Sequence, residues 1–172
     1  MDLFSPVSLG SIELANRVVM APLTRMRAGS SGVPNDLIVE HYAQRASIGL
    51  IITEGTYPRF ESQAFVGQPG IVTDEQVAGW RRVAEAVHAR GGRIVMQVMH
   101  GGRVTHPDTN GGHRVEAPSA IAIEGETHTE KGKQPYPVPH ALTLDEAAEV
   151  RESFVAASRR AIEAGDRNSC SR

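Results

Sequence analysis

The sequence has little cysteine, few aromatic residues, no excess of one charge and no long hydrophobic run. Its one cysteine, Cys170, excludes an internal disulfide and is typical of a cytoplasmic protein. No apolar run approaches the roughly 18 residues of a membrane span, and the opening residues, MDLFSPVSLG, lack the apolar core of a secretory signal. With 18 basic and 20 acidic residues the net charge is −2, so we expect neither nucleic acid nor membrane as a partner.

What the sequence does contain is an alternation of short apolar runs and amphipathic segments. A hairpin is predicted at 7–15, where alternating residues flank Gly10-Ser11. Apolar runs predict strands at 17–21, 49–53 and 93–99. The run at 49–53 is apolar on both faces, which predicts a strand covered on both sides.

Three helices are predicted between and after these strands. Pro34 suits the first turn of one helix, whose predicted inner face holds Leu37, His41, Tyr42, Arg45 and Ala46. A capping box over Thr73–Gln76 begins the second helix, with its apolar face at Val77, Trp80, Val83, Ala84 and Val87. A second capping box over Thr143–Glu146 begins the third, with its apolar face at Ala147, Val150, Phe154, Ala157 and Ala161.

Strict alternation of strands and helices predicts an α/β fold with a parallel sheet. An open doubly wound sheet and a (β/α)₈ TIM barrel both satisfy this pattern. The first strand is followed by APLTRM, with no G-x-G-x-x-G and no P-loop, and Gly132-Lys133-Gln134 lacks the rest of a phosphate-binding motif. These observations favour the barrel.

The last residues do not continue the pattern. A fourth strand is due after Gly165, but 166–172 read DRNSCSR. A TIM barrel typically needs about 250 residues. We therefore expect 1–165 to be the N-terminal part of a barrel, an N-terminal hairpin plus the first three β/α units, truncated before strand four. The alternative is a small three-stranded sheet with a solvated tail.

The segment after the first strand contains Ala21, Pro22, Leu23 and Thr24. Proline cannot donate to a sheet, so this segment is either a plain loop or a place where small residues and a hydroxyl hold a planar polar ligand.

Two further positions bear on that choice. Gln97 interrupts the apolar run of the third strand, where an unpaired amide under the helices would cost about 1–3 kcal/mol, so we expect it to point inward. Gly55, taken alone, is a strand-ending glycine.

Six segments, in order, carry a family resemblance from Leu3 to Gly165. They are LFSPVSLGSIELANRVVMAPLTRMRA, ITEGTYP, QPGIVTDEQVAGWRRV, IVMQVMHGGR, APSAIA and PHALTLDE. Together they resemble the N-terminal portion of the old yellow enzyme family, the NAD(P)H:flavin oxidoreductases and ene-reductases. The tail at 166–172 matches nothing in that family.

The resemblance implies a TIM barrel with FMN across the carboxyl ends of the strands. Residues 21–24 would lie under and beside the isoalloxazine ring, and the Thr24 hydroxyl would bond the flavin C4 oxygen and tune the cofactor. The Gly55 backbone would adjoin the polar edge of the flavin. The Gln97 amide would match its N3–H and C2=O.

The resemblance also suggests substrate contacts and a cap. Met26 and Met99 fall where relatives place aromatic residues near the substrate, and the segment 101–141 would form a capping loop over the flavin. Five of the seven histidines lie between 100 and 140, but they show no metal-ligand spacing, so no metal site is predicted.

The implied reaction passes hydride from NAD(P)H through FMN to a small activated alkene such as an enone. The histidine pair that activates the alkene in the family, and the phosphate-binding loops, have no counterpart here, so we expect weak FMN binding and impaired turnover. A second hypothesis is a non-catalytic fragment that is unstable or associates through open sheet edges to form an oligomer. A third is a flavin-free lyase or isomerase, disfavoured because Glu54 is the lone carboxylate at a strand end.

Overall fold

The structure is a computed structural model that describes residues 2–165. The predicted hairpin is present: β1 (Val7–Leu9) pairs antiparallel with β2 (Ile12–Leu14). Gly10 in the turn has a φ of +60°, a conformation that glycine adopts without steric cost. The predicted non-family tail at 166–172 lies outside the described residues.

Three short parallel strands form the central sheet, in the order β3-β4-β5. They are β3 (Val19–Met20), β4 (Leu50–Ile52) and β5 (Ile94–Val95). All three predicted strands exist, but each is shorter than its apolar run. The ladder between the second and third strands is interrupted because the N–H of Gln97 donates to the hydroxyl of Thr53 at 3.0 Å rather than to a carbonyl.

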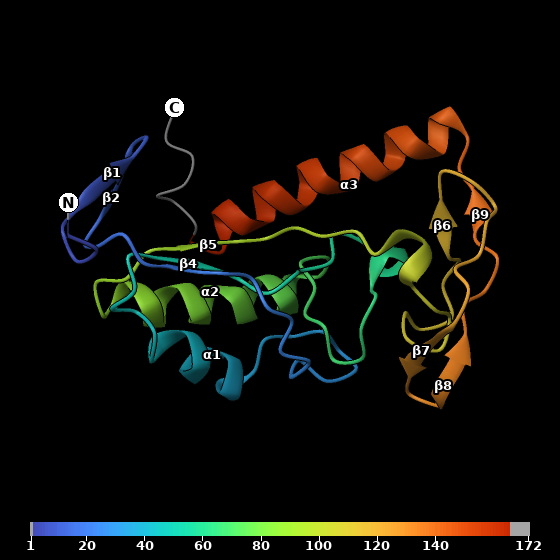
Figure 1. The fold of residues 1–172 in the computed structure, drawn as a ribbon, viewed down its shortest axis with the longest axis horizontal. Helices are drawn as coiled ribbons and strands as arrows, with labels where there is room; N and C mark the ends of the chain where they lie inside the picture. Colours follow the sequence, from blue (N-terminus) through green and yellow to red (C-terminus); the bar gives the residue numbers. More distant parts are fainter. Residues whose placement is uncertain (1, 166–172) are drawn as a thin grey trace.

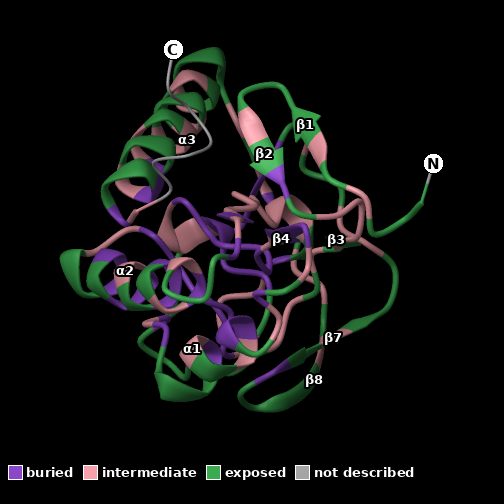
Figure 2. Ribbon diagram, turned by 90° about the vertical axis from the view of Figure 1, so that its left-hand side faces the viewer, coloured by how far each residue is buried: buried purple, intermediate pink, exposed green. Residues whose placement is uncertain are grey.

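Helices follow the strands in the predicted order: α1 (Asp36–Ala43), α2 (Asp74–His88) and α3 (Leu144–Glu163). In Figure 1 α1 and α2 lie below the strands and α3 above them, and the turned view in Figure 2 shows the three helices in an arc beside the strands. Both predicted capping boxes are present, at the starts of α2 and α3. None of the helices within residues 2–165 is long and apolar enough to cross a membrane.

The start and the inner face of α1 differ from the prediction. Asn35 caps the helix by accepting the N–H of Ile38 at 3.2 Å, so Pro34 precedes the helix instead of lying in its first turn. Leu37 is 68% exposed, and the buried face instead runs through Ile38, Tyr42 and Ala43. Leu37, the first apolar residue of the helix, therefore does not pack in the core, and Ile38 does.

The core lies between the sheet and α2, and every residue predicted for the inner face of α2 is buried. On α3 the prediction holds only near the C-terminal end, where Ala157 and Ala161 are buried. Ala147 is exposed, because α3 diverges from the sheet towards its N-terminal end (Figure 1). The predicted five-residue apolar stripe is therefore only partly used.

Only one face of the sheet is covered by helices. Met20, Ile51 and Ile94 belong to that covered face and pack in the core. On the opposite face Val19 is 49% exposed, and Ile52 and Val95 are half-buried. On that face Leu50, the partner of Val19, is nevertheless only 6% exposed. Within residues 2–165 the expectation that 49–53 is covered on both sides therefore holds at Leu50 and Ile51 and fails towards Ile52.

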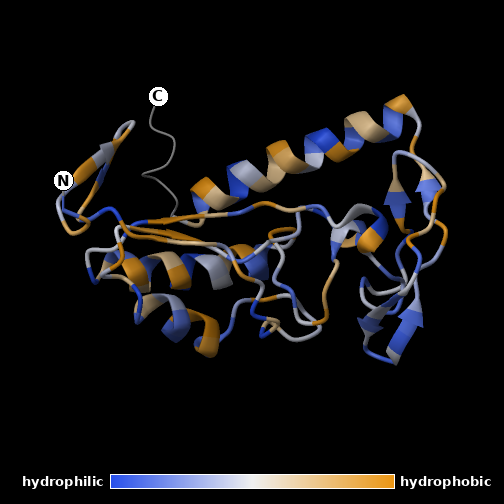
Figure 3. Ribbon diagram, in the orientation of Figure 1, coloured by the Kyte–Doolittle hydropathy of each residue, from blue (hydrophilic) through white to orange (hydrophobic). Residues whose placement is uncertain are grey.

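The segment 101–141 was expected to be a loop, but it contains four short strands. β6 (Glu116–Ala117) pairs parallel with β9 (His140–Ala141), and β7 (Glu126–Thr129) pairs antiparallel with β8 (Gly132–Pro135). The β7–β8 hairpin is predominantly hydrophilic (Figure 3). Two short 3₁₀ helices, Phe60–Ser62 and Gly102–Val104, complete the secondary structure of the described residues.

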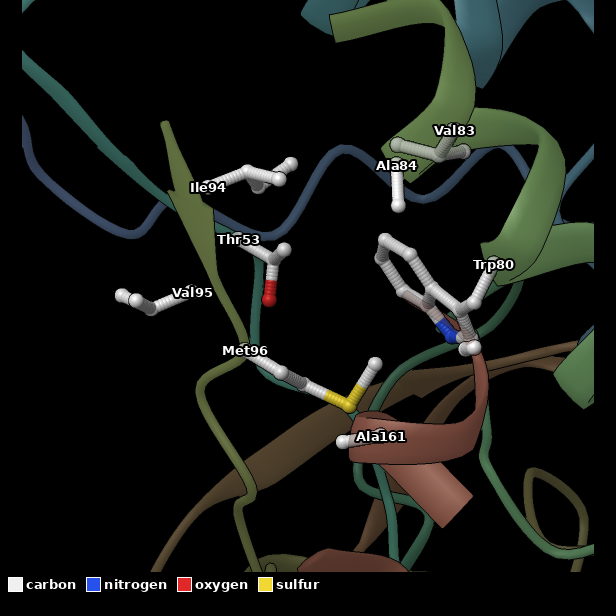
Figure 4. Close-up of a pocket in the computed structure, with 9 residues that line it drawn as sticks. Thr53, Trp80, Val83, Ala84, Ile94, Val95, Met96 and Ala161 are labelled. Carbon is white, nitrogen blue, oxygen red and sulfur yellow. The ribbon is translucent and has the colours of Figure 1, made fainter. Parts of the chain in front are cut away.

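A small cavity lies between the sheet, α2 and the end of α3, beside Thr53, Trp80, Met96 and Ala161 (Figure 4). Its polar groups are already satisfied: the Thr53 hydroxyl donates to the Glu54 carbonyl at 3.0 Å, and the Trp80 indole N–H donates to the Gly70 carbonyl at 3.0 Å. The cavity is therefore a packing gap of the core rather than a ligand site.

Candidate functional site

The segment that follows β3 is largely exposed. Ala21 is exposed, Leu23 is 62% exposed, and Pro22 and Thr24 are half-buried. Within residues 2–165 the Thr24 hydroxyl makes no hydrogen bond. These residues do not serve the core, and the hydroxyl is available to a ligand.

Gly55 lies buried just beyond the end of β4. A Cβ atom built there would lie 2.9 Å from the Met99 sulfur and 3.4 Å from the Gln97 Oε1. A side chain at position 55 would therefore fit only if the end of the flexible Met99 side chain moved away. The bare Gly55 backbone and the Gln97 amide therefore form one wall.

Gln97 has a fixed backbone and a free side chain. Its N–H donates to the Thr53 hydroxyl, and its carbonyl accepts the N–H of Thr56 at 2.9 Å. Its neighbours Met96 and Val98 both pack against the core, so Gln97 lies on the face away from the helices, as predicted. Its side-chain amide makes no hydrogen bond within the described part of the chain.

A buried carboxylate connects the first strand's end to the second. The Oε2 of Glu54 accepts the N–H of Arg25 at 2.8 Å, and Glu54 itself is 0% exposed. Arg25 follows Thr24 and Glu54 precedes Gly55, so the peptide beyond β3 lies against the wall that Gly55 shares with Gln97. Burial raises the pKa of the Glu54 carboxyl, and the hydrogen bond from Arg25 opposes that rise.

A second buried side chain, Gln68, holds the Gly55 peptide from outside. Its Nε2 donates to the Gly55 carbonyl at 2.8 Å, and its Oε1 accepts the N–H of Ala64 at 2.9 Å. Sequence reasoning missed Gln68 and gave Glu54 no positive role. An acidic residue directly after a buried apolar run was a usable signal for Glu54, whereas Gln68 resembles any polar loop residue.

The two methionines behave differently. The side-chain sulfur of Met99 lies against Gly55, and the backbone N–H of Met99 donates to the Thr56 carbonyl at 2.9 Å. Met99 therefore belongs to the wall formed by Gly55 and Gln97. Met26 is 43% exposed and has a φ of 56°, which is rare for a residue with a side chain. The Met26 carbonyl faces Gly67, and no contact of Met26 with Gly55 or Gln97 is seen among residues 2–165.

His100 and His140 have structural partners, although the buried Nε2 atoms of His100 and His41 make no hydrogen bond within residues 2–165. The Nδ1 of His100 accepts the N–H of Gly102 at 2.9 Å while its ring stacks on Phe154, and burial lowers its pKa. His140 bonds the Glu146 carboxylate at 2.9 Å. Among residues 2–165 no three His, Cys, Asp or Glu side chains are grouped so that they could hold a metal ion.

A parallel β/α sheet with unpaired polar side chains beyond its carboxyl ends is typical of an α/β protein that binds a ligand at that edge of the sheet. The family model described as the NADH:flavin oxidoreductase / NADH oxidase family matches residues 2–166, and the chain belongs to this family. The resemblance read from the sequence is thereby confirmed, and the flavin-free alternative is disfavoured.

Individual relatives agree. The chain is 46% identical over 169 residues to a probable flavin mononucleotide-dependent alkene reductase of Leishmania infantum, covering 95% of this chain and 46% of the relative. It is 38% identical over 173 residues to 12-oxophytodienoate reductase 7 of Oryza sativa subsp. japonica, covering 95% and 42%. The chain thus spans about half the length of the curated relatives it matches.

Solved structures give the fold. Morphinone reductase superposes with a TM-score of 0.88 at 46% identity, covering 95% of this chain and 46% of that protein. The old yellow enzyme homologue from Zymomonas mobilis gives a TM-score of 0.92 at 42% identity, covering 96% and 46%. The partial TIM barrel is therefore confirmed, and residues 2–165 form part of a barrel without closing one.

The side chains at the strand ends fit a flavin, the cofactor class in the family's description. A ring edge that carries both carbonyl oxygens and an N–H needs neighbours that donate and accept. The Gln97 amide does both, the Thr24 hydroxyl can donate, and neither is engaged elsewhere in residues 2–165. The missing Cβ at Gly55 leaves that wall flat.

Proposed function

We propose that this chain forms one wall of the FMN site of an old yellow enzyme-type reductase. The observation that carries the proposal is the convergence of Thr24, Gly55 and Gln97 at the strand ends, with their polar side chains unengaged. The substrate class is a small activated alkene such as an enone, and the reductant is NAD(P)H. The names of the relatives, an alkene reductase and a 12-oxophytodienoate reductase, support this choice.

FMN, when bound, would supply the hydride-transfer chemistry between NAD(P)H and the alkene. The amide of Gln97 would hold the polar edge of the ring, because it can both donate and accept. The Thr24 hydroxyl would donate to the C4 oxygen and so stabilise the negative charge of the reduced ring. Backbone groups of residues 21–24 would lie close to the ring, because Ala21 and Pro22 have small or compact side chains.

Substrate contact and capping are the finer parts of the proposal. Met99 flanks the substrate pocket, which its place against Gly55 supports. Met26 is proposed as a second flank and 101–141 as the cap over the flavin. The cytoplasmic location indicated by the sequence stays a prediction.

Titration of FMN into the chain, followed by quenching of flavin fluorescence, tests the proposal. Gln97→Leu removes two hydrogen bonds and is expected to weaken binding by about tenfold or more, and Thr24→Val, which removes one, by about fivefold. Gln44→Leu is the matched control, because Gln44 is an exposed glutamine at the C-terminal cap of α1. Equal affinities for the Gln97→Leu and Gln44→Leu chains would refute the proposal.

A further inference from the structure

Glu54 is a buried carboxylate to which the proposed chemistry gives no part. It is 0% exposed, and within residues 2–165 it has no salt bridge to a cationic side chain. A buried charge without a paired cation is costly unless hydrogen bonds satisfy it. The partners it does have therefore show what the carboxylate does.

Those partners form a chain from α1 to the peptide beyond β3. The Glu54 N–H donates to the Tyr42 hydroxyl at 2.7 Å, and Tyr42 is 0% exposed in the core. On its other side the Glu54 carboxylate accepts the N–H of Arg25 at 2.8 Å. The rigid helix thus holds Glu54, and Glu54 holds the loop.

The loop has few other restraints near Thr24. Leu23, which precedes Thr24, is 62% exposed and packs little, whereas beyond Arg25 the Met26 carbonyl accepts from the Arg27 guanidinium at 3.1 Å. The Thr24 hydroxyl has no hydrogen bond within the described residues. Its position is consequently set through the neighbouring Arg25 peptide.

We propose that Glu54 is a positioning residue that holds the Arg25 peptide so that the Thr24 hydroxyl points at the cofactor. A carboxylate suits this task, because its hydrogen bond to a backbone N–H is charge-assisted and about twice as strong as a neutral one. The inference rests on the proposed function for the role of Thr24, but the attachment of the loop to Glu54 does not. Glu54 touches neither the cofactor nor the substrate in this account.

A double-mutant cycle with FMN as the ligand tests whether Glu54 acts through Thr24. Thr24→Val and Glu54→Leu are each expected to weaken FMN binding about fivefold. The double variant is also expected to be weakened about fivefold, since the hydroxyl that Glu54 positions is already gone. A product of the two effects, about 25-fold, would overturn the proposal, because a general structural role does not depend on the Thr24 hydroxyl.

Val87→Ala is the control for stability. Val87 is 0% exposed in the core and lies against Gly92, ahead of β5, so this change leaves the hydrogen bonds of Tyr42, Glu54 and Arg25 in place. It is expected to lower the free energy of unfolding while the Thr24→Val effect on FMN binding stays fivefold. If Val87→Ala abolished that effect as fully as Glu54→Leu, the effect would follow stability and the proposal would fail.

Hydrogen exchange of the Arg25 amide, followed by NMR without any flavin, tests the attachment itself. Glu54→Leu is expected to speed exchange at this amide about tenfold or more, and Glu54→Gln, which keeps a neutral acceptor and the residue's shape, by a smaller factor. Unchanged exchange in both variants would overturn the proposal even if FMN still binds. Conversely, faster exchange together with equal FMN affinities for the Gln97→Leu and Gln44→Leu chains would refute the proposed function and leave the attachment established.

Discussion

At the scale of single residues, the site depends on which side chains are left without partners. The backbone is held by a hydrogen bond at Gln97 itself and at Arg25, the residue after Thr24. The polar side-chain groups of Thr24 and Gln97 are free. Polar side chains near a sheet normally find partners within the protein. Two that do not, of which Gln97 lies 3.4 Å from the position of a Cβ at Gly55, indicate a surface shaped for a ligand.

Gly55→Ala tests the flatness of that surface. The new Cβ would lie 2.9 Å from the sulfur of Met99, a flexible side chain, and 3.4 Å from the Gln97 Oε1. We expect the chain to fold, because methionine can move, but to bind FMN several-fold more weakly, because the wall is no longer flat. The measurement is the same fluorescence titration.

The companion variant is Gly55→Ala combined with Met99→Ala, which removes the sulfur that the new methyl group meets. If its thermal midpoint recovers while FMN binding stays weak, the defect lies at the wall facing the ligand. Full FMN affinity in Gly55→Ala alone would show that the approach of Gly55 to Gln97 and Met99 has no bearing on the flavin.

The sequence predicts the candidate cofactor-binding residues, but not the residues that hold them in place through hydrogen bonds. Gln97 stands out because an amide interrupts an apolar run, and Thr24 because a hydroxyl follows a strand that ends in proline. Gln68 and Tyr42 gain their roles from partners 13 and 12 positions away, at Gly55 and Glu54. Such pairings are decided by the tertiary fold, and no local pattern encodes them.

At the scale of elements, the helix starts are the best-encoded features. The hydroxyl of Thr143 accepts the N–H of Glu146 at 3.2 Å, and the Glu146 carboxylate accepts the N–H of Thr143 at 2.8 Å. We expect Thr143→Ala to reduce the free energy of unfolding by about 1 kcal/mol, measured by urea denaturation. Thr143→Ser keeps the cap and is the control; an equal loss in both variants would contradict the role of the hydroxyl.

The same cap predicts a pH dependence. The N–H of Thr143 and the ring of His140 lower the pKa of Glu146 to about 2. A carboxyl whose folded pKa lies below its unfolded value of about 4.3 stabilises the fold above the unfolded pKa, and this contribution is lost as pH falls towards 2. Glu146→Gln should therefore flatten the decline of stability between pH 4.5 and 2. An unchanged decline in thermal midpoint over that range would contradict it.

The elements that escaped prediction are the shortest ones. β6 and β9 have two residues each, and β7 and β8 have four, largely polar. Strands this short carry no alternating apolar pattern and are defined by backbone pairing alone. On α3 only Ala157 and Ala161 of the predicted apolar face are buried, for a related reason. A periodic pattern shows which face of a helix could be buried, but not how far along the helix the sheet extends.

At the scale of the whole molecule, the uncovered face of the sheet is the dominant feature. Val19 is 49% exposed beside the buried Leu50, Ile52 and Val95 are half-buried, and β3 and β5 are the edge strands. In a closed barrel such a face is filled by inward-pointing side chains. This explains why runs that are apolar on both faces coexist with a sheet covered on one.

The uncovered face makes a prediction about association. We expect the chain to self-associate or bind an apolar dye, because exposed apolar surface next to open edges favours pairing with another copy. Val19→Lys should reduce association, measured by sedimentation velocity, without lowering the thermal midpoint. Leu9→Lys on the hairpin, where Leu9 is 54% exposed, is the matched control and should leave association unchanged. A strictly monomeric, dye-free chain would contradict the prediction.

The barrel assignment itself came from two different sources. Strand–helix alternation and the missing glycine fingerprint favour a barrel over an open sheet without deciding between them, because the two differ in strands that are not among residues 2–165. Only the ordered family motifs decide it, and the superposition on the Zymomonas mobilis homologue, with a TM-score of 0.92, confirms it.

The most direct test of the account is an NMR titration of the ¹⁵N-labelled chain with FMN. The side-chain amide of Gln97 and the backbone amides of Thr24 and Gly55 should shift together along one binding curve, while that of Gln44 stays still. If FMN moved the resonances of only one strand end, or shifted Gln97 and Thr24 with different dissociation constants, these residues would not share one flat ligand.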